Sequence, residues 1–426
     1  MIHIALLGVG TIGGGVVKLL EQNYNGIKRK SGTDIKLKYV LARTPEKAKQ
    51  LGVDDSQIVQ DFSVILNDPE VDIVVELMGG MGDAYTYIRQ SLEHGKNVVT
   101  ANKDLISFKG KELFELAADN KVDLYYEASV GGTIPIINPM RRTLAANRVD
   151  KMLGILNGTT NYMLTKMTVD GRSYEDVLDE CQRLGFAEAD PSADVDGLDP
   201  ARKIAILAKI AFNVDVTADD VYNEGIREIK QHDIAIAEKM GYALKLLAVA
   251  KDKNKQVQLG VYPVFVPKKH PLASVNDSFN ALFVHGDACG DVMLYGQGAG
   301  AMPTASSVMG DIMQIARHIK AGSTGEDNDI TYLDKKILTI DEVENMFYIR
   351  LLVKDQTNVL SGVAKAFGDN DVSISSVVQN SSDEGEAELV IITHSAAERG
   401  VRAALERIQE KDYVQSIEAV IRVLES

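Results

Sequence analysis

A glycine-rich hexapeptide near the start of the chain is the feature that most restricts its fold. Gly8-Val9-Gly10-Thr11-Ile12-Gly13 follows an apolar stretch at residues 2–7 and leads into a helical pattern over residues 14–22. In this context the glycines permit a tight turn, close backbone approach to a pyrophosphate, and close packing of helix on strand. The N-terminus of the helix then attracts negative charge. The motif predicts a dinucleotide-binding unit whose cofactor contacts are Gly8, Gly10, Thr11, Ile12 and Gly13.

The alternation of short apolar strands and helices continues to about residue 130. Strands are predicted at residues 2–7, 36–42, 71–77, 97–100 and 122–126, with helices between them such as residues 14–22 and 110–120. Strands that alternate with helices favour a parallel, doubly wound α/β sheet. We therefore predict a Rossmann domain over residues 1–130.

Two further domains are expected after this one. Helices at residues 174–184, 199–212 and 232–240 precede strands between residues 243 and 295, which predicts an α+β catalytic and dimerisation domain over residues 131–303. A helix over residues 304–320 is expected to pack back on the first domain, and the polar stretch after it predicts a linker over residues 321–344. Residues 345–426 then read as strand, helix, strand, strand, helix, strand, which predicts a compact βαββαβ unit.

The composition restricts the partners of the chain. It has 61 acidic and 46 basic residues and a formal net charge of -15, so nucleic acid and anionic membranes are repelled. No apolar run approaches the roughly 18 residues of a membrane span, and the start lacks the features of a signal peptide. Cys181 and Cys289 match no metal or disulfide spacing, so both are predicted to be small buried apolar residues. We expect a cytoplasmic protein that binds neither nucleic acid nor membranes.

The end of the second predicted strand bears on the choice of cofactor. An NAD site usually places an acid there to hold the ribose 2′-hydroxyl, whereas this chain has Ala42-Arg43-Thr44. Asp34 lies at the wrong end of that strand. Arg43 can instead pair with a 2′-phosphate, which favours NADP(H) over NAD(H). The alternative is that Arg43 is a solvated surface cation.

Lys103 and a long acidic segment are the candidates for the chemistry. Lys103 follows the predicted strand at residues 97–100, at the carboxyl end where parallel sheets bind ligands. Acids crowd residues 185–203; a calcium loop there would place Lys203 at its twelfth position, where a bidentate glutamate is required, so calcium is rejected. Asp199 instead precedes Pro200 and is a candidate cap for a helix that carries Lys203 one turn later, on neighbouring surface. A solvated acidic loop is the alternative.

Several stretches in a fixed order resemble the homoserine dehydrogenase family across roughly residues 1–320. They are residues 98–103, 127–135, 154–162 and 185–203, together with Gly298-Ala299-Gly300 and Pro303-Thr304-Ala305. The resemblance implies reversible reduction of L-aspartate 4-semialdehyde to L-homoserine, in the biosynthesis of threonine and methionine.

The resemblance also implies roles for individual residues. Lys103 and Lys203 match the catalytic lysines, and a lysine ammonium can stabilise the oxyanion and supply its proton as hydride reaches the aldehyde carbon. Which lysine gives the proton stays open, with Lys203 favoured. The remaining matches are Asp199 among the catalytic residues, Glu188, Asp199 and Gly185 at the substrate, and Lys103 and Gly300 at the cofactor.

A cation site and a regulatory domain are further implications. Glu127, Val130, Gly132 and Ile134 resemble the family's monovalent-cation site for Na⁺ or K⁺, since carboxylate and carbonyl oxygens suit a hard cation. Glu127 could instead cap a strand end. The C-terminal unit resembles an ACT domain, which implies feedback control, commonly by threonine.

The ACT-like turn departs from the usual Asp-x-Pro-Gly-Val-Leu, because it reads Asp355-Gln356-Thr357-Asn358-Val359-Leu360. Asn358 can adopt the left-handed conformation of the missing glycine, so Asp355 and Asn358 stay effector candidates. The alternative is a dimerisation module without a ligand, and we expect a homodimer or homotetramer. The rival functions are a dehydrogenase of another amino acid or aldehyde and a redox-sensing repressor. A repressor needs a basic DNA-reading element, and this acidic sequence has no such cluster.

Overall fold

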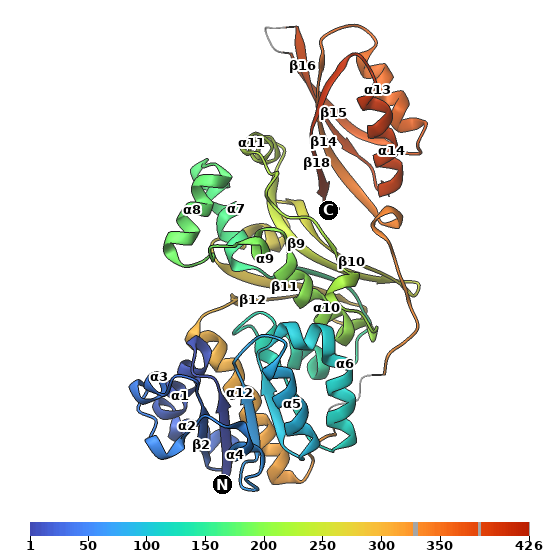
Figure 1. The fold of residues 1–426 in the computed structure, drawn as a ribbon. Helices are drawn as coiled ribbons and strands as arrows, with labels where there is room; N and C mark the ends of the chain where they lie inside the picture. Colours follow the sequence, from blue (N-terminus) through green and yellow to red (C-terminus); the bar gives the residue numbers. More distant parts are fainter. Residues whose placement is uncertain (327–330, 382–384, 426) are drawn as a thin grey trace. The chain divides into compact units, whose positions relative to one another are not determined.

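The computed structural model describes residues 1–326, 331–381 and 385–425, so residues 327–330 of the predicted linker lie outside the described residues. The chain forms two compact units, each assembled from three stretches (Figure 1). Unit 1 comprises Met1–Asp150, Arg202–Asp219 and Phe279–Asp334, and unit 2 comprises Lys151–Ala201, Asp220–Ser278 and Lys335–Ser426. Helix α10 (Leu198–Phe212) therefore begins in unit 2 and ends in unit 1.

Unit 1 is built on a six-stranded parallel sheet with the order β3-β2-β1-β4-β5-β6. Its strands are β1 (Ile2–Leu7), β2 (Ile35–Leu41), β3 (Ile58–Val59), β4 (Ile73–Glu76), β5 (Asn97–Thr100) and β6 (Leu124–Tyr125). The strand order reverses between β1 and β4, and a reversal of this kind marks the ligand-binding crevice of a doubly wound sheet. The predicted Rossmann fold is confirmed.

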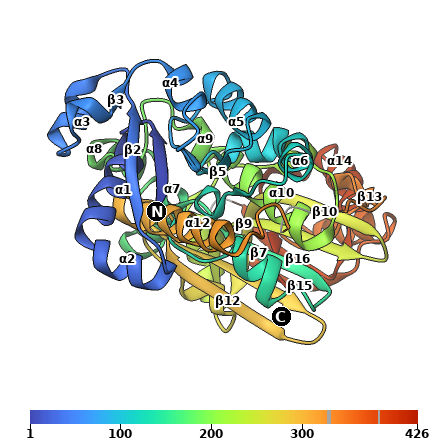
Figure 2. The same ribbon diagram turned by 90° about the horizontal axis from the view of Figure 1, so that it is seen from below.

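Helices cover both faces of this sheet, with α1, α2 and α12 on one side and α4, α5 and α6 on the other (Figure 2). Their bounds are α1 (Thr11–Gln22), α2 (Tyr24–Ser31), α3 (Pro45–Gln50), α4 (Phe62–Leu66), α5 (Asp83–Glu93), α6 (Lys103–Asp119) and α12 (Ala301–Ala321). Ile312 of α12 lies in the same buried cluster as Ile4 and Leu6 of β1. A Cβ at Gly15 would come within 2.6 Å of the Ala301 carbonyl oxygen, so glycine there lets α1 approach α12 closely.

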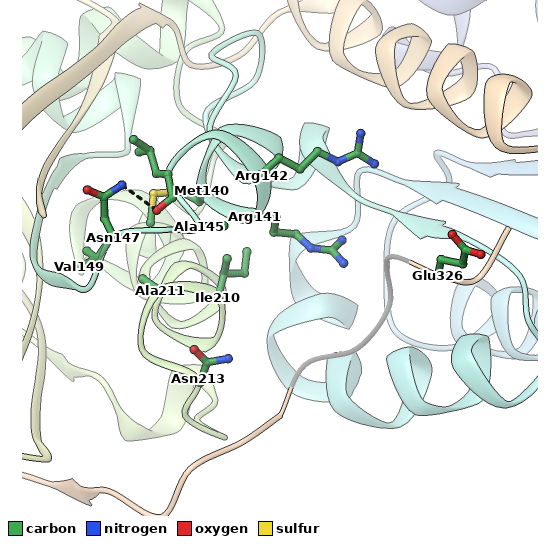
Figure 3. Close-up of a pocket in the computed structure, with 11 residues that line it drawn as sticks. Met140, Arg141, Arg142, Ala145, Asn147, Val149, Ile210, Ala211, Asn213 and Glu326 are labelled. Atoms are coloured by element: carbon green, nitrogen blue, oxygen red, sulfur yellow. Dashed lines mark hydrogen bonds between the residues drawn. The ribbon is translucent and has the colours of Figure 1, made fainter. Parts of the chain in front are cut away.

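Unit 1 also contains a hairpin and a cavity apart from the sheet. The hairpin is formed by β11 (Phe279–Gly286) and β12 (Gly290–Gln297). The cavity, of about 370 Å³, lies beside the π-helical turn Pro139–Thr143. Figure 3 shows the guanidinium groups of Arg141 and Arg142 extending to the side of this turn on which Glu326 lies. Among the residues described, those that line this cavity include none of the predicted site residues.

Unit 2 contains an antiparallel sheet that continues into the C-terminal domain. β9 (Tyr242–Lys253) pairs with β7 (Val149–Ile155) and with β10 (Gln256–Pro267), and β10 meets β18 (Val414–Val423). The other elements here are α7 (Gly158–Asp170), α8 (Tyr174–Leu184), α9 (Ser192–Val195), α11 (Gln231–Lys239) and the short strands β8 (Tyr222–Asn223) and β13 (Lys336–Ile337). The helices α7 and α8 contact each other, and α7 and α11 both contact β9.

The C-terminal domain has the predicted βαββαβ order. Its strands run in the order β18-β14-β16-β15, all antiparallel, and two helices cover its core. The elements are β14 (Glu344–Lys354), α13 (Val359–Gly368), β15 (Ile374–Ser381), β16 (Glu386–Thr393), β17 (Ala396–Ala397), α14 (Glu398–Gln409) and β18. The predicted ACT-like topology is therefore confirmed.

A buried ion pair fastens α11 to this domain. Asp233 of α11 is 1% exposed and Arg350 of β14 is 6% exposed. The guanidinium of Arg350 donates from Nε to Asp233 Oδ1 at 2.7 Å and from Nη2 to Oδ2 at 3.0 Å. The Tyr348 hydroxyl adds a third bond to Oδ1, at 2.9 Å. The carboxylate is thus bound from two alternate positions of one strand.

Several expectations about local structure differ from the structure. Helix α6 begins at Lys103, seven residues before the predicted start at residue 110, because Asn102 caps it through Oδ1. Strand β7 and helix α7 were not predicted; α7 buries Thr160, Asn161 and Thr165 on its inner side, so it shows no clear apolar pattern. Cys289 is exposed, contrary to prediction, since it lies in the turn between β11 and β12. Cys181 is buried as predicted, and burial raises the pKa of its thiol to about 11.

No helix in the described part of the chain is long and apolar enough to cross a membrane.

Candidate active site

The glycine loop borders a cavity of about 620 Å³ in unit 1. Gly8, Val9 and Gly10 line it on one side, and Gly79 and Gly80, which follow β4, line it on another. The cavity is therefore at the carboxyl edge of the parallel sheet, beside the reversal of strand order. Its volume lies within the range of cofactor pockets.

The backbone of the loop explains why glycine stands there. Gly8 has φ +95°, a conformation that side chains disfavour, and a Cβ at Gly13 would come within 2.1 Å of the Gly8 carbonyl oxygen. Gly10 is the N-cap of α1 and supplies no side chain to its first N–H groups. These N–H groups can therefore bind an anion such as a pyrophosphate, as the motif predicts.

Glu76 supports the opposite wall of the cavity and was missed by the sequence analysis. Its side chain is fully buried at the end of β4. Oε1 accepts the N–H groups of Met78 at 2.7 Å and Gly79 at 3.0 Å, and Oε2 accepts the Thr100 hydroxyl at 2.6 Å. These bonds fix the loop after β4. An acid closing an otherwise apolar strand was the available signal.

Arg43 lies at the rim of the same cavity, together with Thr44 and Lys47. Its Nη2 pairs with Asp83 Oδ2 at 3.1 Å, and both side chains are largely exposed. An exposed pair of this kind is weak, so a phosphate can replace Asp83 at little cost. The three residues at this rim offer two cations and a hydroxyl, a suitable donor set for a phosphate group.

The two candidate lysines both belong to unit 1, where α6 and α10 are bound together. Lys103 is the first residue of α6, and Lys203 lies in α10 with 9% of its surface exposed. Their immediate neighbours form an ion pair, because Arg202 Nε lies 2.6 Å from Asp104 Oδ1. Lys209, two turns further along α10, donates to the Ser107 carbonyl at 2.7 Å. The structure therefore brings the backbone positions of the two lysines into one region.

The acidic segment is organised in unit 2 by Asn157, the N-cap of α7. Its Nδ2 donates to Asp194 Oδ1 at 2.6 Å and to Asp199 Oδ2 at 2.9 Å, while its Oδ1 accepts the Thr160 N–H at 2.9 Å. Asp199 does not precede its helix as predicted. Helix α10 begins one residue earlier, at Leu198, so Asp199 lies in the first turn. The sequence analysis missed the role of Asn157, although a polar residue shortly after a buried strand signals a cap.

Gly185 and Glu188 lie near the same helix terminus. Gly185 ends α8 in the left-handed conformation, with φ +75°. The Thr159 hydroxyl donates to the Phe186 carbonyl at 2.8 Å, and Gln182 donates to the Glu188 carbonyl at 3.2 Å. The Glu188 side chain is exposed. Unit 2 thus gathers Gly185, Glu188 and Asp199 near the start of α7, and α10 carries both Asp199 and Lys203.

Glu127 is buried in unit 1, and its carboxylate binds the backbone N–H groups of residues 136–138. Its Oε1 accepts the N–H groups of Ile136 at 2.6 Å and Ile137 at 2.9 Å, and its Oε2 accepts that of Asn138 at 2.7 Å. The Glu127 N–H donates to Asp311 of α12 at 2.9 Å. Burial, and then the negative charge of Glu127, raise the pKa of Asp311 well above its usual range.

The carbonyls predicted to hold a cation lie in the loop after Glu127. Val130 and Ile134 are buried there, and Gly132 has φ +57°. The Gly132 carbonyl accepts the Ser307 hydroxyl at 2.7 Å. A Cβ at Gly132 would come within 2.5 Å of the Gly298 carbonyl oxygen, so the loop packs directly against residues 298–300. Gly300 itself is the N-cap of α12, with φ +125°.

Comparison with known proteins agrees with this arrangement. Two family models match in succession: the NAD-binding domain of homoserine dehydrogenase at residues 8–127 and homoserine dehydrogenase itself at residues 135–313. Homoserine dehydrogenase of Bacillus subtilis is 38% identical over 425 residues, covering 99% of this chain and 98% of its own length. That of Synechocystis is 42% identical over 432 residues, with 99% of both chains covered.

The chain belongs to the homoserine dehydrogenase family. It is therefore an oxidoreductase. The crystal structure of a homoserine dehydrogenase from Thiobacillus denitrificans matches it with a TM-score of 0.94 at 36% identity, covering 100% of this chain and 98% of the other. That of Staphylococcus aureus at pH 8.5 matches with a TM-score of 0.79 at 34% identity, covering 100% and 99%.

An ACT domain accompanies the homoserine dehydrogenase domains, with a family match at residues 347–412. Asn358 stands at the N-cap of α13 with φ +71°, the left-handed conformation that was predicted for it. The Asp355 N–H donates to the Gly385 carbonyl at 2.9 Å, and Gln379 donates to its side chain at 3.3 Å. The turn therefore keeps its shape without proline and glycine.

Proposed function

We propose that the chain catalyses the reversible, NAD(P)H-dependent reduction of L-aspartate 4-semialdehyde to L-homoserine. The observation that carries the proposal is the ion pair between Arg202 and Asp104, which holds the neighbours of Lys203 and Lys103 together in the unit with the nucleotide cavity. Family membership supports the same reaction. The step belongs to the biosynthesis of threonine and methionine.

The bound nicotinamide would supply a hydride to the aldehyde carbon. Charge then grows on the aldehyde oxygen, which the ammonium of Lys203 stabilises and protonates, with Lys103 as a second cation. Asp199 and Glu188 attract the substrate ammonium, and Gly185 adds backbone contacts. Asn157 keeps Asp199 oriented through its bond to Oδ2. Lys103 and Gly300 complete the cofactor site beside the glycine loop.

A direct assay tests this function. Purified protein is mixed with aspartate semialdehyde and either NADPH or NADH, and oxidation of the reduced nicotinamide is followed by its absorbance. Turnover is expected with this aldehyde and not with other short aldehydes or keto acids. A higher efficiency with another amino-acid-derived aldehyde would favour the second candidate, a dehydrogenase whose ACT domain serves assembly.

Arg43 is proposed to select NADP(H). Replacing it with alanine is expected to lower the ratio of NADPH to NADH efficiency by roughly 10- to 100-fold, since a charge-assisted bond contributes about 1.5–3 kcal/mol. The measurement is kcat/KM for both cofactors. Arg89→Ala, on the exposed side of α5 where Arg89 pairs with Glu93, is the matched control. An unchanged ratio in Arg43→Ala would exclude the role.

A monovalent cation is proposed to bind at Glu127 and the carbonyls of Val130, Gly132 and Ile134. A carboxylate offers about four lone-pair sites, and three N–H groups occupy three of them, which leaves one for a cation. Turnover is expected to rise several-fold when Na⁺ or K⁺ is added to enzyme dialysed into N-methylglucamine buffer. Choline chloride at equal ionic strength is the control, and equal rates in all three salts would contradict the site.

Regulation and assembly complete the proposal. The ACT domain is proposed to transmit feedback control by an amino acid, with threonine as the first candidate and the turn at Asp355 and Asn358 as the first candidate site. We propose a homodimer or homotetramer in the cytoplasm.

A further inference from the structure

The cavity of about 370 Å³ in unit 1 is lined by the π-helical turn Pro139–Thr143 and by the end of α10. The turn is closed by the bond that defines a π-helix, from the Leu144 N–H to the Pro139 carbonyl five residues earlier, at 2.8 Å. Single π-helical turns are rare in proteins and are frequent at functional sites. Among the described residues, none lines both this cavity and the nucleotide cavity.

Two consecutive arginines of the turn give this cavity a positive charge. Arg141 and Arg142 both line it, and their guanidinium groups extend to the same side of the turn (Figure 3). Arg142 Nη2 donates to the Tyr125 hydroxyl at 2.5 Å, which fixes the position of this guanidinium. Arg141 is half-buried, and it has no hydrogen-bond or ion-pair partner within the described part of the chain. The charge of Arg141 is therefore available to a ligand.

The chemistry of these arginines indicates the kind of ligand. The chain has 61 acidic residues, yet none of those described pairs with Arg141. A guanidinium presents its N–H donors in a planar fork that matches two oxygen atoms of a phosphate or carboxylate group. Two forks on consecutive residues favour a group with two negative charges and several oxygens. A phosphate monoester provides both on one phosphorus atom.

The rest of the lining suits the organic part of such a ligand. Its apolar side chains are those of Met140, Leu144, Ala145, Val149, Ile210 and Ala211. The amide of Asn147 is already bound, because its Oδ1 accepts the Cys289 N–H at 2.8 Å and its Nδ2 donates to the Leu144 carbonyl at 3.1 Å. Glu326 is the single acid among the described lining residues; it is exposed and forms no ion pair within the described part of the chain. The volume lies within the range of small-molecule pockets.

The cavity also adjoins two elements on which the proposed reaction depends. The π-helical turn follows residues 136–138, whose N–H groups bind the Glu127 carboxylate. Helix α10, whose last turn lines the cavity, carries Lys203. A ligand in the cavity therefore contacts both elements.

We propose that this cavity is a binding site for a small phosphate monoester. The phosphate group pairs with the guanidinium groups of Arg141 and Arg142, and the organic part of the ligand contacts the apolar side chains. Glu326, at the edge of the cavity, repels the phosphate and lowers the affinity. The site is separate from the nucleotide cavity, so this inference goes beyond the proposed dehydrogenase function and does not rest on it.

Calorimetric titration of the full chain tests the site, at a pH above the second pKa of phosphate and with saturating NADP⁺ to occupy the nucleotide cavity. The probes are inorganic phosphate, n-butyl phosphate and succinate. Butyl phosphate is expected to bind most tightly and succinate least tightly. Arg141→Gln and the cavity-filling Ala211→Leu are expected to weaken the binding of butyl phosphate by roughly tenfold or more. Arg148→Gln, which removes an exposed arginine outside the lining, is expected to bind normally.

Glu326→Gln tests the charge of the ligand. Removing this carboxylate is expected to tighten the binding of butyl phosphate several-fold, because a repulsion is lost. Glu406→Gln, the same change at an exposed position of α14, is expected to have no effect. Weaker binding in Glu326→Gln would show that the cavity prefers a ligand with a positive charge and would overturn the proposal.

Three other results would also overturn it. They are the failure of both phosphate probes to bind, undiminished binding of butyl phosphate by Arg141→Gln, and tighter binding of succinate than of butyl phosphate. Because binding is measured directly, a chain that binds butyl phosphate through Arg141 but does not reduce aspartate semialdehyde would support this site and contradict the proposed reaction.

Discussion

Lys203→Ala is expected to lower kcat by roughly 10²- to 10⁴-fold while NADPH binds with nearly unchanged affinity. The reason is that the ammonium of Lys203, a residue that is 9% exposed, acts on charge that develops only in the transition state. The measurements are steady-state turnover with aspartate semialdehyde and a fluorescence titration of NADPH.

Controls for this result come from the same pair of helices. Lys109→Ala removes an exposed ammonium from α6 and is expected to leave kcat within about twofold. Partial recovery of Lys203→Ala by added ethylamine would identify the missing group as the proton donor. If Lys203→Ala keeps normal turnover while Lys103→Ala loses it, the donor is Lys103 and the assignment to Lys203 is wrong.

Asp233→Ala is expected to destabilise the protein by up to about 3–5 kcal/mol, because the buried Arg350 guanidinium loses its bidentate partner and keeps only its longer contacts with Glu388, at 3.3 Å, and Glu418, at 3.9 Å. The Tyr348 hydroxyl loses its acceptor as well. Urea unfolding followed by circular dichroism gives the change. Limited proteolysis is expected to cleave the variant first in the chain between α11 and β14, because the contact between Asp233 and Arg350 holds α11 to the C-terminal domain.

Two variants decide whether charge burial is the cause. Asp341→Ala breaks an exposed ion pair with Arg402 and is expected to cost less than about 1 kcal/mol. The double variant Asp233→Leu with Arg350→Met removes both buried charges and is expected to recover most of the lost stability. A double variant as unstable as Asp233→Ala would show that the effect arises from packing and not from the loss of the carboxylate that binds Arg350.

The parts of the structure that could be predicted depend on residues that lie close together in the sequence. The glycine loop needs positive φ and close approach at Gly8 and Gly13, and only glycine permits both, so the motif revealed the nucleotide domain. The βαββαβ order of the C-terminal domain was predicted from the alternation of its strands and helices. Asn358 was predicted to be left-handed because asparagine is among the few residues that tolerate that conformation.

What escaped prediction depends on contacts between distant residues. Asp233 and Arg350 are 117 positions apart, and neither has a local signal for burial or pairing. The binding of Asp199 by Asn157 joins residues 42 positions apart, so no local pattern indicates it. Helix α7 was missed because its inner face includes threonine and asparagine. Asn161 donates to the Val275 carbonyl and Thr165 accepts the Asp277 N–H, both far along the chain.

The place of α12 in the nucleotide-binding unit has a consequence for synthesis on the ribosome. Residues of this helix such as Ile312 complete the core against Ile4 and Leu6, yet α12 ends at Ala321, long after β5 ends at Thr100. Translation adds about 5–20 residues per second, so roughly 10–45 s pass between the synthesis of β5 and that of α12, and α12 is absent from the apolar face of the sheet during this time. During that interval the nascent chain is a natural client for chaperones that bind exposed apolar surface. A ribosome stalled before α12 would therefore hold a dinucleotide fold with its strands translated and its core still open to water.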